Sequence, residues 1–332
     1  MESTESSSGS HLSRRELILL GIGAFALFAA PFARRGKQRL VRRRLPMMGT
    51  VAEIGVVDPD PRRAQGAIDA AFGELARVER LMTRFTHSSD VGRANLEAAQ
   101  SPVRVAHETA TVLAEAVAWA AATDGEFDPC VGKAVELWDV SHRDRPPPQA
   151  AIKRLAGRHL YRGLELDTWR GAPVVRFRDP EIALDLGGIA KGYGVDRAVS
   201  ALRKWGIRDG LVNVGGDLYA LGESEDGDPW RVGVRSPTDP DRLAGRIEVR
   251  DRAVATSGDY MQYFRYGNRR YHHLLDPATG APRMSGVHSV TAVAESCITA
   301  DAAATAVFGM DEERANALLA ARAPAARIVS LL

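Results

Sequence analysis

The sequence contains little cysteine and few aromatic residues. Its two cysteines, Cys130 and Cys297, are too few for a disulfide framework or a thiolate zinc cluster in a chain of 332 residues. Aromatic residues make up 6% of the chain, which does not favour a stacking platform for single-stranded nucleic acid. Hydrophobic residues make up 45% and charged residues 26%, which is typical of a folded globular protein and excludes collagen, coiled coils and a wholly disordered chain.

The charge is unevenly distributed. Of the 44 basic and 42 acidic residues, nine basic and three acidic residues lie within positions 1–44. The rest of the chain therefore has 35 basic and 39 acidic residues, a net charge of −4. A mildly acidic body argues against binding to nucleic acid.

The amino-terminal segment has the pattern of an export signal. Residues 13–17 read Ser-Arg-Arg-Glu-Leu, and no charge follows Glu16 until after Ala33, which is typical of the twin-arginine route. This stretch just reaches the lower limit for a membrane span, and Pro31-Phe32-Ala33 fits a cleavage site poorly, so an uncleaved anchor is the alternative. We expect a signal or anchor over 1–33, a basic linker over 34–46, and a body over 47–332 at the periplasmic or extracytoplasmic face of the membrane.

The body mixes strands and helices without regular alternation. Apolar spacing predicts helices over Pro61–Met82, Glu108–Ala122, Gln149–Arg158, Ile189–Trp205, Ile298–Phe308 and Asp311–Ala321. Apolar and β-branched runs predict strands over Thr50–Val57, Val174–Phe177, Ile182–Leu186, Leu211–Val214, Trp230–Arg235, Arg246–Val249, Val254–Ser257 and His288–Ala294. The order favours an α+β fold of mixed sheets flanked by helices over a doubly wound sheet.

A glycine-rich turn joins the predicted strand that ends at Leu186 to the next helix. Gly187 and Gly188 permit close approach of a ligand to the backbone, and the free N–H groups of the first helical turn favour an anion. Lys191 adds a positive charge within one turn, although its position before Gly192 does not match a P-loop. The same residues are also typical of an ordinary tight turn followed by a surface lysine.

Asp301 and Thr305 lie four residues apart on a predicted helix and therefore share a face. Small apolar residues surround them, and no basic residue lies near them in the sequence. Because a buried carboxylate without a partner is costly, a bound cation would stabilise it. Carboxylate and hydroxyl oxygens suit Mg²⁺, completed by phosphate and water. The alternative is that Asp301 caps the helix.

The segment from Arg270 to Gly280 carries His272 and His273 close to Asp276. Histidine titrates near neutral pH and acts as a general base in many enzymes. Adjacent residues of a strand point to opposite faces, so one histidine of the pair faces a given site. The alternative is a pair of exposed histidines at a strand edge.

Six ordered blocks resemble the FAD:protein FMN transferase family, also called the ApbE family, from Met47 to about Met310. The blocks are Met48–Thr50, Met82–Asn95, Gly125–Trp138, Leu184–Tyr193, Val214–Asp217, and Ala255–Tyr260 together with the histidine segment and Ser296–Asp301. The resemblance implies an ApbE-like fold of the T-fold type and an enzyme that requires one or two Mg²⁺ ions. Such an enzyme cleaves FAD, releases AMP, and attaches FMN through a phosphoester bond to a threonine or serine of a partner protein.

The resemblance also implies site residues. The family's flavin contacts would fall on Met48, Phe85, Glu126, Phe127, Asp128, Asp185, Lys191 and Leu275, and its metal ligands on Gly188 (through the carbonyl), Asp301 and Thr305. His273 stands at the family's histidine, and we interpret it as the base for the acceptor hydroxyl, with Asp276 beside it as a second catalytic candidate.

Three positions depart from the family pattern without removing a metal ligand. Phe85 stands where tyrosine is common, Cys130 where threonine is common, and Leu275 where isoleucine is common. No Gly-Ala-Thr or Gly-Ala-Ser occurs, so a separate acceptor, a membrane or periplasmic electron-transfer protein, is expected. The alternatives are an FAD pyrophosphatase that yields FMN and AMP, and a non-catalytic, membrane-tethered flavin-binding protein.

Overall fold

The computed structural model describes residues 25–27, 39–239 and 241–332. The expected signal or anchor over 1–33 lies outside the described residues, apart from β1 (Phe25–Leu27). Within the described ranges, no helix combines the length and the apolar character that a membrane crossing requires.

The centre of the fold is a seven-stranded antiparallel sheet with the strand order β17-β16-β11-β8-β7-β3-β2. Its strands are β2 (Arg39–Met47), β3 (Thr50–Asp58), β7 (Asp209–Val214), β8 (Asp217–Leu221), β11 (Arg252–Gly258), β16 (Ser289–Ala294) and β17 (Arg327–Leu331). The central strands β8 and β16 are buried at every position because both faces of the sheet are covered. The edge strand β2 carries four arginines, and charge on an edge discourages pairing with a further strand.

Three helices cover one face of this sheet, namely α2 (Pro61–Met82), α7 (Ala190–Lys204) and α8 (Cys297–Ala306). The side chain of Asp60 caps α2 by accepting the N–H of Arg62, and Pro61 occupies the first turn, where a missing N–H costs nothing. The apolar stripe of α2 is buried with residues of α7 and the sheet in one core cluster. The opposite face is covered by a small sheet of β1, β9 (Trp230–Arg235) and β10 (Leu243–Val249).

A second lobe surrounds α4 (His107–Ala122), whose Trp119 is fully buried. Its other helices are α3 (Asp90–Glu97), α5 (Gly132–Trp138), α6 (Gln149–Leu155), the short η1 (Leu160–Gly163) and α9 (Glu312–Arg322). Its strands are β4 (Val103–Arg104), β5 (Leu164–Trp169) and β6 (Ala172–Phe177). Two hairpins complete the fold, β12 (Tyr263–Tyr266) with β13 (Arg269–His272) and β14 (Leu275–Asp276) with β15 (Ala281–Pro282).

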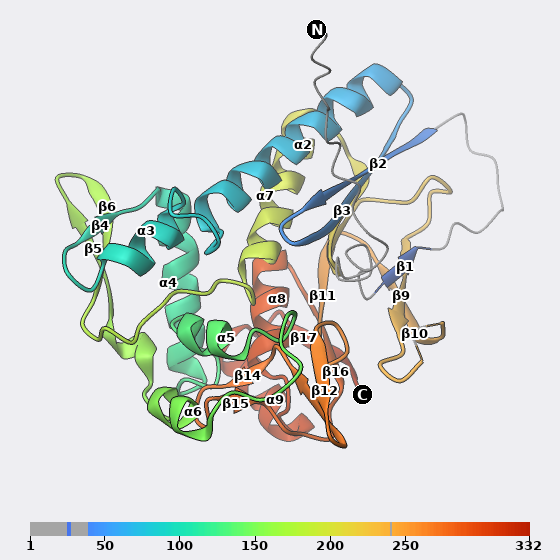
Figure 1. Cartoon of the computed structure of the whole chain (residues 1–332). Coiled ribbons are helices and arrows are strands. Elements are labelled where there is room, and N and C mark those ends of the chain that lie inside the picture. The colour runs from blue at the N-terminus through green and yellow to red at the C-terminus, as the bar shows by residue number, and fades with distance from the viewer. Residues whose placement is uncertain (1–24, 28–38, 240) are drawn as a thin grey trace, which may run out of the picture.

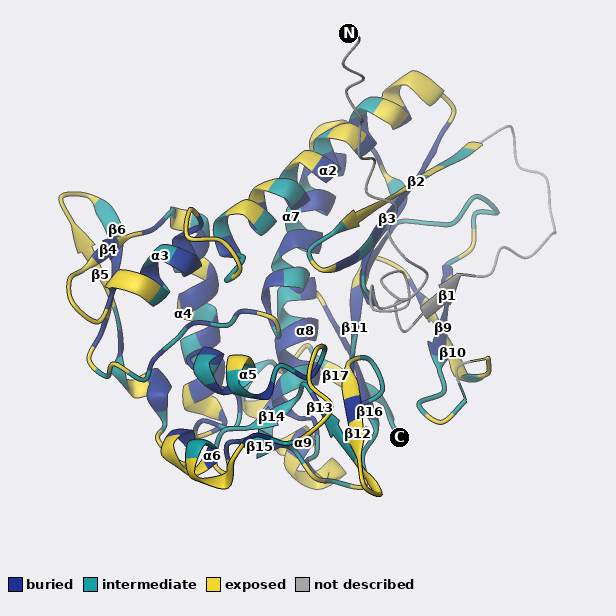
Figure 2. Cartoon of the chain, viewed as in Figure 1, coloured by how far each residue is buried: buried dark blue, intermediate teal, exposed yellow. Residues whose placement is uncertain are grey.

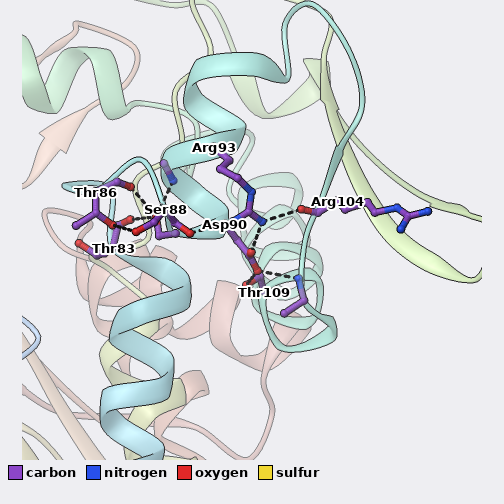
Figure 3. A network of polar contacts seen from close by, with 10 residues as sticks. Thr83, Thr86, Ser88, Asp90, Arg93, Arg104 and Thr109 are labelled. Atoms are coloured by element: carbon purple, nitrogen blue, oxygen red, sulfur yellow. Dashed lines mark hydrogen bonds and ion pairs between the residues drawn. The ribbon is translucent and has the colours of Figure 1, made fainter.

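A buried carboxylate joins α3 to α4 (Figure 3). Asp90 accepts hydrogen bonds from the N–H of Ala106 and the hydroxyl of Thr109, both at 2.7 Å, and pairs with Arg93 at 2.6 Å. Arg93 also donates to the carbonyl of Arg104 at 3.0 Å. Ala106 begins α4 without a capping side chain of its own, so Asp90 performs that function from the neighbouring helix.

The α+β class and all six predicted helices are confirmed, each within one turn of its predicted bounds. The predicted strand over Ile182–Leu186 is wrong, although its apolar residues are buried as a strand's would be. Its backbone makes a single bridge, from Ala183 to Val131, and Asn95 holds Leu184 by two hydrogen bonds of 2.6 and 3.0 Å. Part of the expected linker, from Arg39 onward, instead forms β2, because it pairs with β3 along its whole length.

We predict that Asp90→Ala lowers the free energy of unfolding by about 2–3 kcal/mol, because it leaves the guanidinium of Arg93 and the start of α4 without their partner. The matched control is Asp311→Ala, which removes the cap of α9 and should cost about 1 kcal/mol. Urea unfolding followed by circular dichroism measures both values. Equal losses in the two variants would contradict this account of Asp90.

Candidate functional site

The site lies where α7 and α8 approach each other. Gly192 makes this approach possible, since a β-carbon there would lie 2.3 Å from the carbonyl oxygen of Cys297. The N–H of Gly192 donates to Oδ2 of Asp301 at 2.9 Å. The close packing of the two helices therefore fixes one oxygen of the Asp301 carboxylate against the backbone of α7.

The start of α8 is held by Asp196 of α7. Its two carboxylate oxygens accept the N–H groups of Cys297 and Ile298 at 2.7 and 2.9 Å, and burial raises the pKa of Asp196 to about 6. Asp196 accepts the free N–H groups of the first turn of α8, and Asp301 lies further along this helix. The interpretation of Asp301 as the cap of its own helix is therefore wrong. Sequence reasoning missed Asp196, since a cap supplied by another helix leaves no local pattern.

Lys191 lies between two buried carboxylates. Its Nζ is 2.6 Å from Oδ2 of Asp217 and 3.4 Å from both oxygens of Asp301, and it donates to the carbonyl of Gly187 at 3.2 Å. Asp217 and Asp301 are each only 2% exposed. The fold thus brings a basic residue to Asp301 that the sequence around Asp301 does not contain. We call these three residues the acid–lysine centre.

In the acid–lysine centre one ammonium faces two buried carboxylates, and this shifts the pKa values of Lys191 and Asp217. Burial opposes the charge of Lys191, but the carboxylates outweigh it and raise the pKa of Lys191 above its ordinary value. Burial and the nearby Asp301 raise the pKa of Asp217 to about 7. Sequence reasoning missed Asp217 as a site residue, although the Val-Gly-Gly-Asp block that contains it was a signal.

Gly188 lies directly against Thr305. A β-carbon at Gly188 would be 2.8 Å from Cγ2 and 3.1 Å from Oγ1 of Thr305, and that hydroxyl shares a hydrogen bond of 3.0 Å with Ser257. Thr305 is one helical turn from Asp301 on α8. The three predicted metal ligands are therefore brought together, and Ser257 is a neighbour that sequence reasoning did not name.

The oxygen atoms of Gly188, Asp301 and Thr305 are ligands that suit a hard cation. Across the described ranges, no three His, Cys, Asp or Glu side chains cluster closely enough to hold a metal by themselves. A cation here would depend on a carboxylate, a hydroxyl and a backbone carbonyl, which are oxygen ligands of the kind that Mg²⁺ accepts. Asp301 is buried and its oxygens lie 3.4 Å from Lys191, against 2.6 Å for Asp217, so its charge is only partly compensated and a cation would stabilise it.

The two histidines have different surroundings. His272 is buried; its Nδ1 accepts the N–H of Leu274 at 3.2 Å and its Nε2 lies 2.8 Å from the carbonyl of Arg283, so it holds the loop in place. His273 is half-buried, and its Nδ1 lies 3.4 Å from the carbonyl of Gln262. Desolvation and the neighbouring His272 lower the pKa of His273 to about 4, and the charge of Lys191 acts in the same direction. Of the two histidines, His273 is therefore the one whose pKa the charge of Lys191 lowers.

Asp276 stabilises the turn in which it lies. Its carboxylate oxygens accept the N–H of Ala278 at 2.9 Å and the hydroxyl of Thr279 at 3.0 Å. These bonds form a local Asx turn, which stabilises the loop after β14. The geometry therefore gives Asp276 a structural role in the turn and does not bring it to His273 as a hydrogen-bond partner.

Phe85 and Asp185 lie together beside the glycine-rich turn. Asp185 accepts the N–H of Gly187 at 2.8 Å and pairs with Nε of Arg84 at 2.8 Å. The guanidinium of Arg84 lies 4.4 Å from the ring centre of Phe85, which is 79% exposed. A large exposed aromatic ring beside this glycine-rich turn can stack on a planar ligand. Arg84 is a further residue that sequence reasoning missed.

Met48 borders the same helix from the other side. Its backbone has a φ of 53°, and its N–H donates to Oε1 of Glu79 in α2 at 2.8 Å. Its sulfur lies against Gly194 of α7, where a β-carbon would be 3.2 Å away. Met48 is therefore held against the α7 segment that begins at the glycine-rich turn.

The remaining candidates are Glu126, Phe127 and Asp128, in the loop before α5, and Leu275 of β14. Asp128 is buried and accepts the N–H groups of Cys130 and Tyr161 at 2.8 and 3.2 Å, and burial raises its pKa to about 6. Phe127 belongs to the core of the second lobe. Glu126 pairs with Arg314 and lies 3.7 Å from Arg283. Leu275 packs against the cluster of Trp138, Val140, Ile152 and Phe264. The side chains of Phe127 and Asp128 thus stabilise the loop rather than line an open site.

Comparison with known proteins agrees with this geometry. A curated FAD:protein FMN transferase of Vibrio cholerae is 36% identical over 278 residues, which cover 82% of this chain and 82% of the relative. The crystal structure of the ApbE protein of Thermotoga maritima has a TM-score of 0.78 and 32% identity, and the match covers 87% of this chain and 93% of that one. The flavin transferase ApbE from Vibrio cholerae has a TM-score of 0.74 and 32% identity, with 86% and 91% covered.

These similarities extend over the region that contains the glycine-rich turn, the acid–lysine centre and the histidine segment. The family model described as the ApbE family matches residues 48–329, almost the whole described body. The expected ApbE-like fold is confirmed, and the chain belongs to the ApbE family.

Proposed function

We propose that this protein is an FAD:protein FMN transferase. In the reaction, a threonine or serine oxygen of a separate acceptor protein forms a bond to the phosphorus of the FMN half of FAD. The bond from that phosphorus to the AMP oxygen breaks, and AMP leaves. The observation that carries the proposal is the acid–lysine centre next to the glycine-rich turn, in a chain whose relatives bear this enzyme name.

Mg²⁺ is the proposed metal, as one or two ions, because the available ligands are oxygens and the buried carboxylate of Asp301 is only partly compensated by Lys191. The carbonyl of Gly188, the carboxylate of Asp301 and the hydroxyl of Thr305 would hold it. When bound, it supplies positive charge that offsets the charge on the diphosphate of FAD.

The residues of the chain bind and orient the substrate. In the first turn of α7, the N–H groups of Ala190 and Gly192 are bound by the carbonyl of Leu186 and the carboxylate of Asp301. The proposed contact with the diphosphate is therefore made by Lys191, whose ammonium Asp217 holds in place. His273 is the proposed base that accepts the proton of the acceptor hydroxyl. Its lowered pKa keeps the ring neutral, and therefore able to accept a proton, at physiological pH.

The acceptor and the cellular location belong to the same proposal. The twin-arginine pattern and the apolar segment up to Ala33 support export, with the body at the periplasmic or extracytoplasmic face of the membrane. The acceptor is then a membrane or periplasmic protein of electron transfer, since covalent FMN is a redox group.

The first prediction concerns the metal ligand. Asp301→Asn should lower FMN transfer about 100-fold or more, and chelation of Mg²⁺ should abolish transfer in the unaltered protein. The assay mixes the purified protein, FAD, Mg²⁺ and a candidate acceptor, then measures the mass added to the acceptor and the AMP released. The control is Asp241→Asn, an exposed aspartate outside the site.

Two results would contradict the proposed transfer. One is the absence of an FMN adduct on every candidate acceptor while FAD binds normally. The other is AMP release at the same rate with and without an acceptor, which would show that water is the acceptor and that the protein is a pyrophosphatase.

The second prediction concerns Lys191. Lys191→Met should weaken FAD binding about tenfold, because a charged hydrogen-bond donor to the diphosphate is lost. Calorimetric titration with FAD in the presence of Mg²⁺ measures the dissociation constant. Lys204→Met, at the far end of the same helix, is the control and should bind FAD unchanged. Unchanged affinity in the Lys191 variant would make that lysine a structural residue only.

The third prediction concerns the protonation of His273. Because its folded pKa is lowered from an ordinary 6.5 to about 4, the ring should stay neutral as the pH falls from 8 to 5 and become charged only below that. The imidazole NMR signal, assigned by its absence in His273→Gln, reports the titration directly. A midpoint near 6.5 would show that the ring is solvated and would remove the stated reason for its neutrality.

A further inference from the structure

The hairpin of β12 and β13, residues 263–272, is basic although the body of the protein is mildly acidic. It contains Arg265, Arg269 and Arg270 and no Asp or Glu. Arg265 and Arg269 are exposed, as are Tyr263 at 39% and Tyr266 at 54%. Figure 2 shows β12 as one of the exposed strands of the molecule. We call this segment the basic hairpin.

One face of the basic hairpin is anchored to the protein. Phe264 stacks on Tyr271 with ring centres 5.1 Å apart, and Tyr271 stacks on Trp138 of α5 at 5.6 Å. Phe264 and Trp138 are buried in one cluster. The base of the hairpin is therefore held in a fixed position. Tyr263 and Arg265 lie on the face of Arg270 and the buried His272, and Tyr266 and Arg269 lie on the face of Phe264 and Tyr271, so the exposed parts are β12 and the tip.

Two arginines of the basic hairpin repel each other across the strands. Arg265 lies directly opposite Arg270 in the strand pairing, and like charges in that position destabilise a hairpin. Asp259 compensates Arg270 at 2.7 Å, whereas the described residues provide no carboxylate for Arg265 or Arg269. The contact of Arg265 is with the ring of Tyr263, at 6.0 Å. An acidic partner would supply the missing negative charge.

The basic hairpin ends next to His273, the proposed catalytic base. His273 follows the last residue of β13, and its N–H donates to the carbonyl of Gln262, the residue before β12, at 3.2 Å. A chain that lies along this hairpin therefore passes next to the proposed base. Exposed tyrosines and arginines are the side chains most enriched at protein interfaces.

We propose that the basic hairpin is the docking surface for the acceptor protein, and that the occupant is an acidic segment close to the modified threonine or serine. This inference rests on the proposed function, since it adds the recognition chemistry of the acceptor. Arg265 and Arg269 lie on opposite faces of the hairpin near its tip, so their guanidinium groups pair with aspartate or glutamate side chains of a segment that crosses the tip, and the tyrosine rings contact its apolar groups.

The test uses two synthetic peptides that share a central threonine, one flanked by glutamates and the other by glutamines. Binding of each labelled peptide to the full-length protein with FAD and Mg²⁺ is measured by fluorescence anisotropy. The glutamate peptide should bind at least tenfold more tightly than the glutamine peptide, and added salt should reduce this difference. Transfer of FMN to the threonine is measured in parallel.

The variant for this test is Arg265→Glu with Arg269→Glu, both exposed positions that the fold does not need. It should weaken binding of the glutamate peptide at least tenfold and leave FAD affinity unchanged. The control is Arg62→Glu with Lys204→Glu, the same change of charge in α2 and α7, where α2 begins at the opposite end of the molecule from β12. It should bind the glutamate peptide as the unaltered protein does.

Equal binding of the two peptides, or unchanged binding in the hairpin variant, would overturn the proposed docking surface. Weaker FAD binding in the hairpin variant would also overturn it, because the arginines would then serve the nucleotide. Tight, hairpin-dependent binding without transfer to any threonine would instead contradict the transferase reaction and leave the docking surface standing.

Discussion

The site depends on the ion pair of Lys191 with Asp217, at 2.6 Å. The same ammonium also contacts the carboxylate of Asp301. Lys191 lies closer to Asp217 than to Asp301, whose two oxygens are 3.4 Å from its Nζ, so the buried charge of Asp301 is only partly compensated. A hard cation beside Asp301 would complete this compensation. The two carboxylates also keep Lys191 charged, so the same arrangement supports both the proposed metal and the proposed contact with a diphosphate.

Helix packing puts this interaction in place. Gly192 allows α7 to lie against the start of α8, and Asp196 of α7 caps α8. The buried main sheet holds both helices on one face, and β8 begins with Asp217. The N–H of Gly192 and the ammonium of Lys191 therefore position the carboxylate of Asp301 before any ligand binds.

Helices such as α2 and α7 could be predicted because their apolar residues form a stripe, and strands such as β3 and β16 because they are rich in β-branched residues. The short helix α3 and the strand β8, which has no β-branched residue, were not predicted. The pairing of Asp301 with Thr305 could also be predicted, since helical spacing fixes it. The position of Lys191 beside Asp217 could not, because it depends on packing between segments far apart in the sequence. The role of Asp276 could not be predicted either. Its short spacing from His273 indicated that it was a partner of that histidine, but its carboxylate oxygens accept hydrogen bonds from Ala278 and Thr279 in its own turn.

The central claim is that Gly188, Asp301 and Thr305 share one cation. Anomalous scattering from crystals of the protein grown with FAD and Mn²⁺ in place of Mg²⁺ tests it most directly. The account predicts an anomalous peak in contact with the carbonyl oxygen of Gly188, the carboxylate of Asp301 and the hydroxyl of Thr305. A fully occupied ion bound elsewhere, with Lys191 still bridging Asp217 and Asp301 beneath the diphosphate, would contradict it.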